Sequence, residues 1–488
     1  MMSRARSDRI AEARSEEWGF TVVRFTLVLC IACVTAAGIY WLTREENVAA
    51  TIGWLPRPGP VPTVMMTTTV PPSAPACDMV VGPEIDRITR EDVAPGDRVC
   101  LESGARGPLR IEAVAGSEAD PIVFTNDGGI TVIEGDEGDY AGVDIRGSSY
   151  LVITGGGIES TCGARFDETD QQCGIVIRGT GRGLAATERS DHLTVDHLAI
   201  SETTHSGIFI KTGADEGVSR DEWTQQATVV TDNYLYDVGR EGLYLGSSFY
   251  TERPDPVLIG VTVARNLVVD SGWDGIQVGS AVEDCSIQGN RVVGAGAENR
   301  DDQNSGIINN KGSVCSIIDN VVFGSAAQGI YLQGNGGNLV ANNVVVQPGT
   351  RSPWEGDGIT VSRGSNEGRS VAVLHNTVVG APRTGVLFRL DVGDGNRVGN
   401  NLFVAVQRPI DLSRGEADVA GNVVVSALGD AGFADPYQSD FRLTAGAPAV
   451  DAGAALPEAP THDLTGWPRP DGSGPDAGAF EFRGGASR

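Results

Sequence analysis

Two acidic side chains occupy the same position in successive sequence repeats, directly before a glycine that opens an apolar segment. Glu241 precedes the segment GLYL at 242–245, and Asp274 precedes GIQV at 275–278. If the repeats stack in register, the two Cα atoms lie about 5 Å apart. Two carboxyl groups at that distance can catalyse glycoside hydrolysis, because one of them keeps its proton as a general acid. Turn residues that diverge into water would give the same pattern.

Three basic side chains near this pair could take up a proton. His205 and Lys211 flank the apolar segment at 207–210, and Lys311 follows the segment at 306–309. Histidine is the commonest general base near neutral pH, and lysine can serve when its pKa is lowered. The candidate acid and base residues are therefore Glu241, Asp274, Lys211, His205 and Lys311.

Aromatic and basic side chains recur at fixed distances after the repeated glycines. Side chains alternate along a strand, so the second and fourth residues after each glycine should point outward. The second position holds aromatic rings that a sugar can stack on. The fourth holds a basic row, counted from Gly142, Gly174 and Gly207, that could bind a carboxylate or sulfate. Solvated strand ends would explain the same basic row. The candidate binding residues are Tyr244, Tyr331, Phe209, Arg178 and Trp273, the last beside an insertion.

The element that must position these residues is a short repeat. Between Ser305 and Gly349 a glycine-led apolar segment and an apolar segment with an inner asparagine occur twice, 23 residues apart. A unit of that size buries its apolar side only by stacking on a copy of itself. The sequence therefore predicts an all-β solenoid. The asparagine recurs at Asn233, Asn266, Asn290, Asn320, Asn343, Asn376, Asn401 and Asn422.

These asparagines are expected to be scaffold residues. In stacked coils a buried amide can pair with the backbone or with the asparagine of the next coil. The earliest copy of the unit has Leu198 in the asparagine position. The row should therefore begin at Asn233.

The charge of the chain excludes one class of partner. The net charge is −27, and residues 1–50 hold six arginines and six acids, so the excess lies beyond residue 50. Such a surface argues against nucleic acid as a partner. No cofactor is indicated, and a calcium ion held by clustered acids remains open, with no metal ligand identified.

The first 76 residues predict export. Residues 25–42 are uncharged and apolar and would span about 27 Å as a helix, close to a bilayer core. Five arginines precede them, which places residues 1–24 in the cytoplasm and the remainder outside. Residues 43–76, rich in proline and threonine, form an extracellular linker. A cleaved signal peptide with processing near Ala50 is the alternative, and it would make the protein secreted.

Six cysteines beyond the apolar segment suggest three disulfides in an exported domain. The pairs are expected to be Cys77–Cys100, Cys162–Cys173 and Cys285–Cys315. Cys285 and Cys315 each lie five residues before a repeated asparagine, so they should be neighbours on adjacent coils. The coils are expected over 77–430, and residues 431–488 should cap the last coil.

The repeat resembles the right-handed parallel β-helix superfamily, which includes pectate lyases and polygalacturonases. The tail is similar to one on exported bacterial β-helix proteins, through FRLTAGAPAVDAG, DLTG and PRPDGSGPDAGAFE. The resemblance implies a single-stranded right-handed parallel β-helix. Asn310-Lys311-Gly312 resembles the lysine element of chondroitinase B and alginate lyases, but Gln333 stands where that resemblance implies an arginine.

We therefore expect a membrane-anchored extracellular protein that binds an acidic polysaccharide or cell-envelope glycan. Cleavage by a lyase or glycoside hydrolase mechanism is left open. A non-catalytic surface adhesin, or a structural protein that binds glycan or protein, is the alternative.

Overall fold

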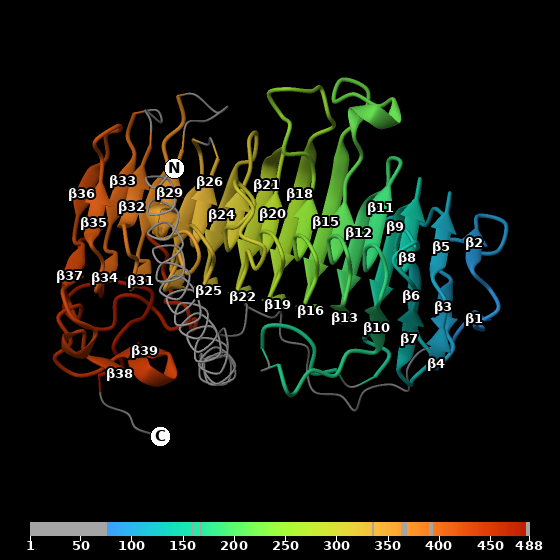
Figure 1. The fold of residues 1–488 in the computed structure, drawn as a ribbon, viewed down its shortest axis with the longest axis horizontal. Coiled ribbons are helices and arrows are strands. Elements are labelled where there is room, and N and C mark those ends of the chain that lie inside the picture. The colour runs from blue at the N-terminus through green and yellow to red at the C-terminus, as the bar shows by residue number, and fades with distance from the viewer. Residues whose placement is uncertain are drawn as a thin grey trace, which may run out of the picture. The chain divides into compact units, whose positions relative to one another are not determined.

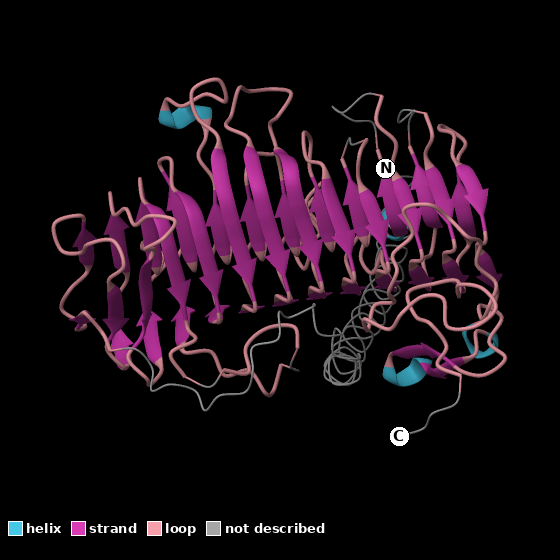
Figure 2. Cartoon of the chain, turned by 180° about the vertical axis from the view of Figure 1, so that it is seen from behind, coloured by secondary structure: helices cyan, strands magenta, loops and turns pink. Residues whose placement is uncertain are grey.

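The structure is a computed structural model that describes residues 76–158, 160–165, 168–333, 336–362, 368–389 and 394–484. In this part of the chain nearly all regular structure is short parallel strands, which stack in coils (Figures 1 and 2). Each complete coil contributes one strand to each of three sheets, here called A, C and B in the order in which the chain visits them, whereas the first coil lacks a sheet C strand and the last coil a sheet B strand. The expected all-β solenoid is confirmed.

Sheet A has 13 strands. They are β1 (Met79–Val81), β3 (Arg98–Leu101), β6 (Ile122–Asn126), β9 (Ser149–Thr154), β12 (Asp191–Asp196), β15 (Gln225–Thr231), β18 (Leu258–Ala264), β21 (Ala281–Gln288), β24 (Cys315–Ile318), β27 (Leu339–Ala341), β30 (Ala372–Leu374), β33 (Arg397–Gly399) and β36 (Asp418–Ala420).

Sheet C has 12 strands, most of them labelled in the lower part of Figure 1. They are β4 (Gly104–Arg106), β7 (Thr131–Glu134), β10 (Ile175–Arg178), β13 (Leu198–Ser201), β16 (Tyr234–Tyr236), β19 (Leu267–Val269), β22 (Arg291–Val293), β25 (Val321–Phe323), β28 (Val344–Val346), β31 (Thr377–Val379), β34 (Leu402–Val404) and β37 (Val423–Val425).

Sheet B has 12 strands and carries the candidate site. They are β2 (Arg87–Thr89), β5 (Leu109–Glu112), β8 (Val143–Arg146), β11 (Leu184–Thr187), β14 (Ile208–Ile210), β17 (Leu243–Leu245), β20 (Ile276–Val278), β23 (Ile307–Asn309), β26 (Ile330–Leu332), β29 (Asp357–Val361), β32 (Thr384–Phe388) and β35 (Arg408–Asp411). Two short 3-10 helices, η1 (Ala214–Glu216) and η2 (Pro353–Glu355), lie in its loops.

The interior of the stack is a continuous column of aliphatic side chains. Ile208, Leu243 and Ile276 follow one another in register on β14, β17 and β20, and all three are fully buried. Burial of one such side chain contributes about 1.5–3 kcal/mol. Because every coil repeats this contribution, the stacking of coils stabilises units that could not fold alone.

The turn from sheet A into sheet C contains the asparagine row, and that prediction is confirmed. Asn320 donates from Nδ2 to Oδ1 of Asn343 (3.0 Å) and to the carbonyl of Ile287 (2.8 Å). Its own Oδ1 accepts from the backbone N–H and from Nδ2 of Asn290, both at 2.9 Å. The same pattern links the whole row from Asn233 to Asn422, and Leu198 precedes it as expected.

The three predicted disulfides are also confirmed. Their Cα–Cα distances are 5.7 Å for Cys77–Cys100, 5.1 Å for Cys162–Cys173 and 4.5 Å for Cys285–Cys315. The last pair joins directly opposed residues of β21 and β24. The register inferred from the asparagine spacing is therefore correct in these coils.

The sequence predicts the wrong sheet for one repeated segment. The segment after Gly174 is β10 of sheet C, whereas the sheet B strand of that coil is β11, which follows Gly183. The true segment reads LAAT, whose alanines are weak strand formers, while IVIR after Gly174 fits the strand pattern better. Arg178 therefore lies on sheet C, opposed to Ser201 of the next coil, and not in the row of Arg146 and Lys211.

The C-terminal tail does not close the last coil as expected. Residues from Ala431 to Phe480 pack against the outer face of sheet C and form a second apolar core with residues such as Val344, Val346 and Leu402. The short helix η3 (Leu428–Asp430) precedes the tail, which includes β38 (Phe433–Asp435), η4 (Pro436–Gln438) and β39 (Asp440–Leu443). The physical reason is that the outward positions of these sheet C strands are valine and leucine, which need an apolar cover.

The predicted membrane anchor at 25–42, the processing position at Ala50 and the linker up to residue 75 lie outside the described residues. From residue 76 onward, no described helix is long and apolar enough to cross a membrane.

Candidate functional site

The turns from sheet C into sheet B carry a second buried polar row. Each residue of the row precedes the first glycine of a sheet B segment, and backbone hydrogen bonds connect successive members, as from Gly207 N–H to the Glu241 carbonyl (3.0 Å) and from Gly242 N–H to the Asp274 carbonyl (3.1 Å). We call it the acidic row. All its members are buried: Ser206, Glu241, Asp274, Ser305, Gln328, Asp357 and Thr384.

Glu241 and Asp274 are adjacent in this row, as their spacing predicted. Burial raises the pKa of Glu241, and the Ser206 hydroxyl, which donates to its Oε2 at 2.8 Å, opposes the rise together with Arg240 and Arg182. Burial raises the pKa of Asp274 well above its ordinary value, and the charges of Glu241 and Asp302 add to the rise. Its Oδ1 accepts from the Ser305 N–H at 2.7 Å, while its buried Oδ2 finds no partner in the described residues.

The two carboxyl groups do not face a groove. Glu241 is 2% exposed and Asp274 0% exposed, so a sugar lying on sheet B would not reach either group in this arrangement. The expectation that they diverge into water, or line a groove, is therefore wrong. The spacing in the sequence predicted that the two residues are neighbours, but it did not predict that they are buried. Residues 296–305 are an insertion in the repeat, and the start of this insertion bonds the turn just before Asp274.

The outer face of sheet B instead carries cations on aromatic rings. The guanidinium of Arg182 lies 4.5 Å from the ring centre of Tyr140 and 4.8 Å from that of Phe209. Phe209 in turn meets Tyr244 of the next coil edge to face, with 5.5 Å between ring centres. Such contacts between a cation and a ring contribute about 0.5–1 kcal/mol when exposed and more when desolvated.

Lys211 continues this surface. Its Nζ lies 5.3 Å from the ring centre of Tyr244 and 5.5 Å from that of Phe249. The Tyr244 hydroxyl bonds the Ser248 hydroxyl at 2.8 Å, which fixes the ring over the sheet. We call Tyr140, Arg182, Phe209, Lys211, Tyr244 and Phe249 the cation–aromatic strip.

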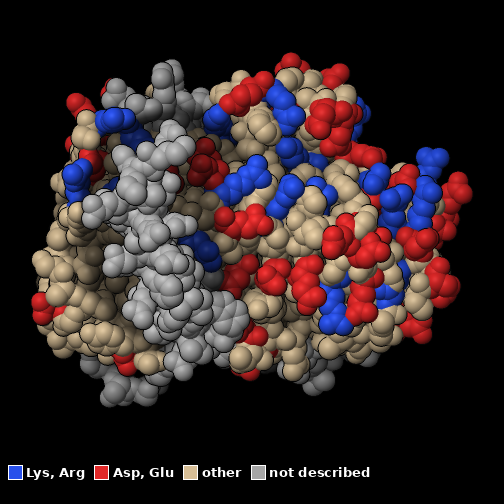
Figure 3. All heavy atoms as spheres, in the orientation of Figure 1, with Lys and Arg blue, Asp and Glu red and all other residues tan. Residues whose placement is uncertain are grey.

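The two cations of the strip make no ion pair with a described acidic side chain. Within the described residues neither Arg182 nor Lys211 forms an ion pair, although the chain as a whole is strongly acidic and its arginines elsewhere are often paired, as Arg253 is with Asp255 (3.1 Å). Figure 3 shows acidic and basic side chains interleaved over one face of the molecule.

The pKa of His205 reflects the positive charges near the strip. Its pKa is lowered by partial burial and then by the charges of Arg240 and Arg182. The imidazole is therefore held neutral near pH 7 and could accept a proton. His205 lies in the turn that leads into β14, and the backbone N–H of Arg240 donates to its carbonyl at 3.2 Å.

The other predicted site residues have partners of their own. Lys311 is ion-paired with Glu252. The ring of Trp273 has Arg240 at 4.6 Å and Arg300 at 3.9 Å, and its Nε1 donates to Glu298 at 2.9 Å. Tyr331 is only 6% exposed. These three belong to packing contacts beside the strip, and the structure does not bring them together with it.

Arg178 is separated from the strip by the register correction. It pairs with Glu134 of the preceding coil on sheet C. Arg182, Tyr140, Phe249 and Arg240 were not predicted from the sequence. Arg182 stands two residues before the LAAT strand. Recognising LAAT as the sheet B strand, with alanine at its second residue, would have pointed to Arg182.

Two loops build the wall beside Lys211. Arg220 donates to the carbonyls of Tyr250 (2.8 Å) and Arg253 (2.5 Å) and so ties the loop after β14 to the loop after β17. The buried Asp255 accepts from the Ala214 N–H at 2.8 Å. Its hydrogen bonds and the charges of Arg253 and Lys211 together lower its pKa, although burial opposes them. These bonds fix the loops that place Phe249.

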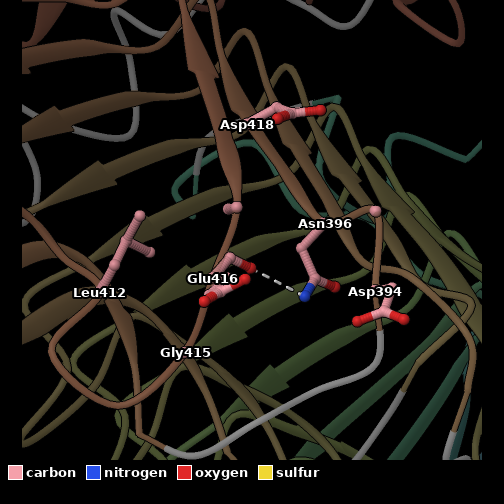
Figure 4. A pocket seen from close by; sticks show the side chains of 8 residues that line it. Asp394, Asn396, Leu412, Gly415, Glu416 and Asp418 are labelled. Carbon is pink, nitrogen blue, oxygen red and sulfur yellow. Dashed lines mark hydrogen bonds between the residues drawn. The ribbon is translucent and has the colours of Figure 1, made fainter.

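No group of three or more His, Cys, Asp or Glu side chains in the described ranges could hold a metal ion. An acidic pocket of about 470 Å³ lies at the last coil and is lined by residues that include Asp394, Glu416 and Asp418. Figure 4 shows the Asn396 amide donating to the Glu416 carbonyl across it, at 3.0 Å.

Comparison with known proteins agrees with this architecture. Residues 221–403 match the family model described as "Right handed beta helix region". The chain is a right-handed parallel β-helix. No curated relative matches its sequence.

Solved structures resemble the β-helix as a fold. A pectate lyase, Pel9A, superposes with a TM-score of 0.48 and 15% identity, over 84% of this chain and 98% of that one. An alginate lyase from Paenibacillus sp. str. FPU-7 gives 0.38 and 16%, over 71% and 99%. A GH136 lacto-N-biosidase from Eubacterium ramulus gives 0.40 and 14%, over 67% and 63%. At these identities the likeness concerns the fold alone.

Proposed function

We propose that the β-helix binds an acidic polysaccharide along the cation–aromatic strip of sheet B. The observation that carries the proposal is the pair Arg182 and Lys211, which lie over aromatic rings without an ion pair in the described part of a chain of net charge −27. Aromatic rings give a sugar an apolar surface, and the neighbouring cations bind its carboxylate or sulfate groups.

The spacing of the strip supports a polymer as the ligand. Phe209 and Tyr244 are opposed residues of β14 and β17, so the strip continues from one coil to the next along the axis. Adjacent coils are about 4.8 Å apart. An extended chain of sugars could therefore contact several coils at once, and each contact would add to the affinity.

Export of the protein is part of the proposal. Three disulfides agree with an oxidising compartment. Retention by the apolar segment 25–42, with the β-helix outside the cell, follows from the sequence and is tested by protease protection of intact cells. Release after cleavage near Ala50 is the outcome that would replace it.

The binding test uses one matched control. Affinity electrophoresis of the full chain in gels containing polygalacturonate, alginate or a sulfated glycan should show retardation that weakens with salt. Lys211→Met and Arg182→Met should each weaken binding about tenfold, since each removes one cation from a desolvated contact. Arg178→Met, on sheet C, should leave binding unchanged. Equal loss in the Arg178→Met variant, or no retardation by any anionic glycan, would refute the proposal.

Cleavage of the bound glycan is a second candidate, favoured by one observation. His205 lies at the turn into β14 with a lowered pKa, so a neutral base is present beside the strip. A lyase would produce unsaturated sugar ends, which are followed by ultraviolet absorbance. Turnover that disappears in His205→Gln while binding persists would establish it. Binding without turnover on the same polymers would identify the protein as an adhesin or structural glycan binder.

A further inference from the structure

The two ends of the β-helix differ in how their interior is closed. At the C-terminal end Val419 of β36 is opposed to Val398 and Val424 of β37 to Phe403, and both of these partners are fully buried interior residues. Val419 is nevertheless 50% exposed and Val424 55% exposed. The column of interior side chains therefore ends with two valines facing solvent.

The N-terminal end is closed. Val81 and Ile88 of the first coil are fully buried, and Ile85 and Val93 pack against the core from outside it. Val80 is 57% exposed, but it is opposed to Cys100, on the outward side of sheet A. Both ends have exposed valines, but only Val419 and Val424 at the C-terminal end belong to the interior column.

The tail leaves the C-terminal end open because it packs along sheet C. Its core contacts include Val425, the outward residue of β37, and not the inward Val424. In the described residues β35, β36 and β37 are each the last strand of their sheet, so one side of each strand has no strand partner. Open strand edges next to exposed apolar side chains are typical of surfaces that pair with another chain.

We propose that the C-terminal end of the β-helix binds the same end of a second copy, in a two-fold dimer. Among the described residues, the N-terminal end exposes Val80 only on the outward side of sheet A, so head-to-tail stacking on the interior column is not favoured. A two-fold contact is self-complementary and closes after two copies. With the axis through the turn between β35 and β36 and the middle of β37, each β35 faces β36 of the second copy, and β37 faces itself.

Two opposite charges at the turn fit this axis. Arg414 and Glu416 flank Gly415 at the turn, are both exposed, and form no ion pair in the described residues. A two-fold axis at Gly415 sets Arg414 of one copy against Glu416 of the other, twice over. The β37 edge is Val423-Val424-Val425, without charge, so two such edges can meet antiparallel with Val424 opposite Val424.

The main test is the mass of the full chain in mild detergent, measured by sedimentation across a dilution series. The wild type should form a dimer, and Val419→Asp/Val424→Asp should reduce the apparent mass twofold. Val80→Asp, a matched exposed valine at the closed end, should remain dimeric. Both substituted valines are exposed, so folding should persist, as checked by thermal unfolding.

A cross-link gives an independent measurement. In an antiparallel pair, opposed side chains are close enough for a disulfide, so Val424→Cys should form a covalent dimer on oxidation, whereas Val80→Cys and the wild type should not. A monomeric wild type, a dimer that survives the double substitution, or equal disruption by Val80→Asp would overturn the proposal. Capture of a different partner by a monomeric protein would likewise assign the end to that partner instead.

Discussion

Two buried polar rows run along the β-helix, one in the turn from sheet A to sheet C and one in the turn from sheet C to sheet B. The asparagine row is chemically uniform, and each amide both donates to and accepts from its neighbour, as Asn320 does with Asn343 and Asn290. The acidic row changes residue type at almost every coil. It includes a carboxyl oxygen, Oδ2 of Asp274, that has no partner in the described residues.

The difference shows what repetition alone can achieve. A neutral amide satisfies itself by pairing with an identical amide one coil away, so any number of coils can be added. A carboxyl group opposite another carboxyl group cannot do so, because both are acceptors when ionised. The asparagine row is expected to stabilise the fold at every pH, whereas the acidic row should make its stability depend on pH.

The largest effect is expected from the middle of the asparagine row. Asn320→Ala removes the partner of Asn290, Asn343 and the Ile287 carbonyl, all of them buried. Each buried group left unpaired costs about 1–3 kcal/mol, so the free energy of unfolding should fall by about 3–5 kcal/mol. Urea denaturation measures it.

The matched control is the end of the same row. Asn422 is only partly buried, accepts from Asn401 and donates to the Val398 carbonyl at 2.7 Å. Asn422→Ala should cost about 1 kcal/mol, since water can replace the lost partners. Equal losses at the two positions would show that the row is not a cooperative stack.

The next effect has the opposite sign. Asp274→Asn should stabilise the protein at pH 8 by about 1–3 kcal/mol, because it removes a buried carboxyl group that must be ionised or kept protonated there. The folded-state pKa of Asp274 is raised, so the contribution of this group to stability is fully present below its ordinary pKa of 3.8 and is lost as pH rises through the raised value.

The measurement for Asp274 is the difference between two thermal unfolding profiles taken against pH. Wild type and Asp274→Asn should converge at low pH and diverge toward alkaline pH. Taking the difference cancels other buried acids such as Asp319, whose pKa is raised to about 7. Curves that run parallel at all pH values would show that the pKa of Asp274 is the same in the folded and the unfolded protein.

The fold could be predicted from the sequence because its repeats carry it. Asn320 and Asn343 recur with the glycines at a fixed spacing, and that spacing also predicted the Cys285–Cys315 disulfide. The prediction failed at Gly174, where a better strand pattern concealed the poorer one after Gly183. The pattern of residue types along the chain cannot decide which segment belongs to sheet B when the segment that does has the weaker strand pattern.

The site was predicted only in part, because Phe209, Lys211 and Tyr244 occupy positions of the repeat whereas the other members of the strip do not. Arg182 contacts Tyr140 and Phe209, which come from two different coils. Phe249 is placed by a loop that Arg220 fixes through two carbonyl groups, a contact with no sequence signature. The burial of Asp274 likewise depends on how an insertion folds over the turn. Local spacing gives register, whereas exposure depends on packing between distant segments.

The smallest effect should separate the two rows most sharply. The Ser206 hydroxyl donates to Oε2 of Glu241 and thereby lowers the pKa of that carboxyl group. Ser206→Ala removes this hydroxyl. At a pH where Glu241 is ionised, the loss should be about 1 kcal/mol. At low pH the neutral carboxyl group depends less on that donor, so the loss should shrink, which is the sign expected for a group whose folded-state pKa rises further.

The double variant Ser206→Ala/Glu241→Gln decides how the Ser206 result is read. In this background no carboxylate remains for the hydroxyl to stabilise, so the cost of Ser206→Ala should lose its dependence on pH. The cost of Asn320→Ala should show no such dependence in either background, because an amide does not titrate. If the cost of Ser206→Ala stayed constant across pH in the wild type, the acidic row would be as purely structural as the asparagine row, and the contrast between the two turns would rest on composition alone.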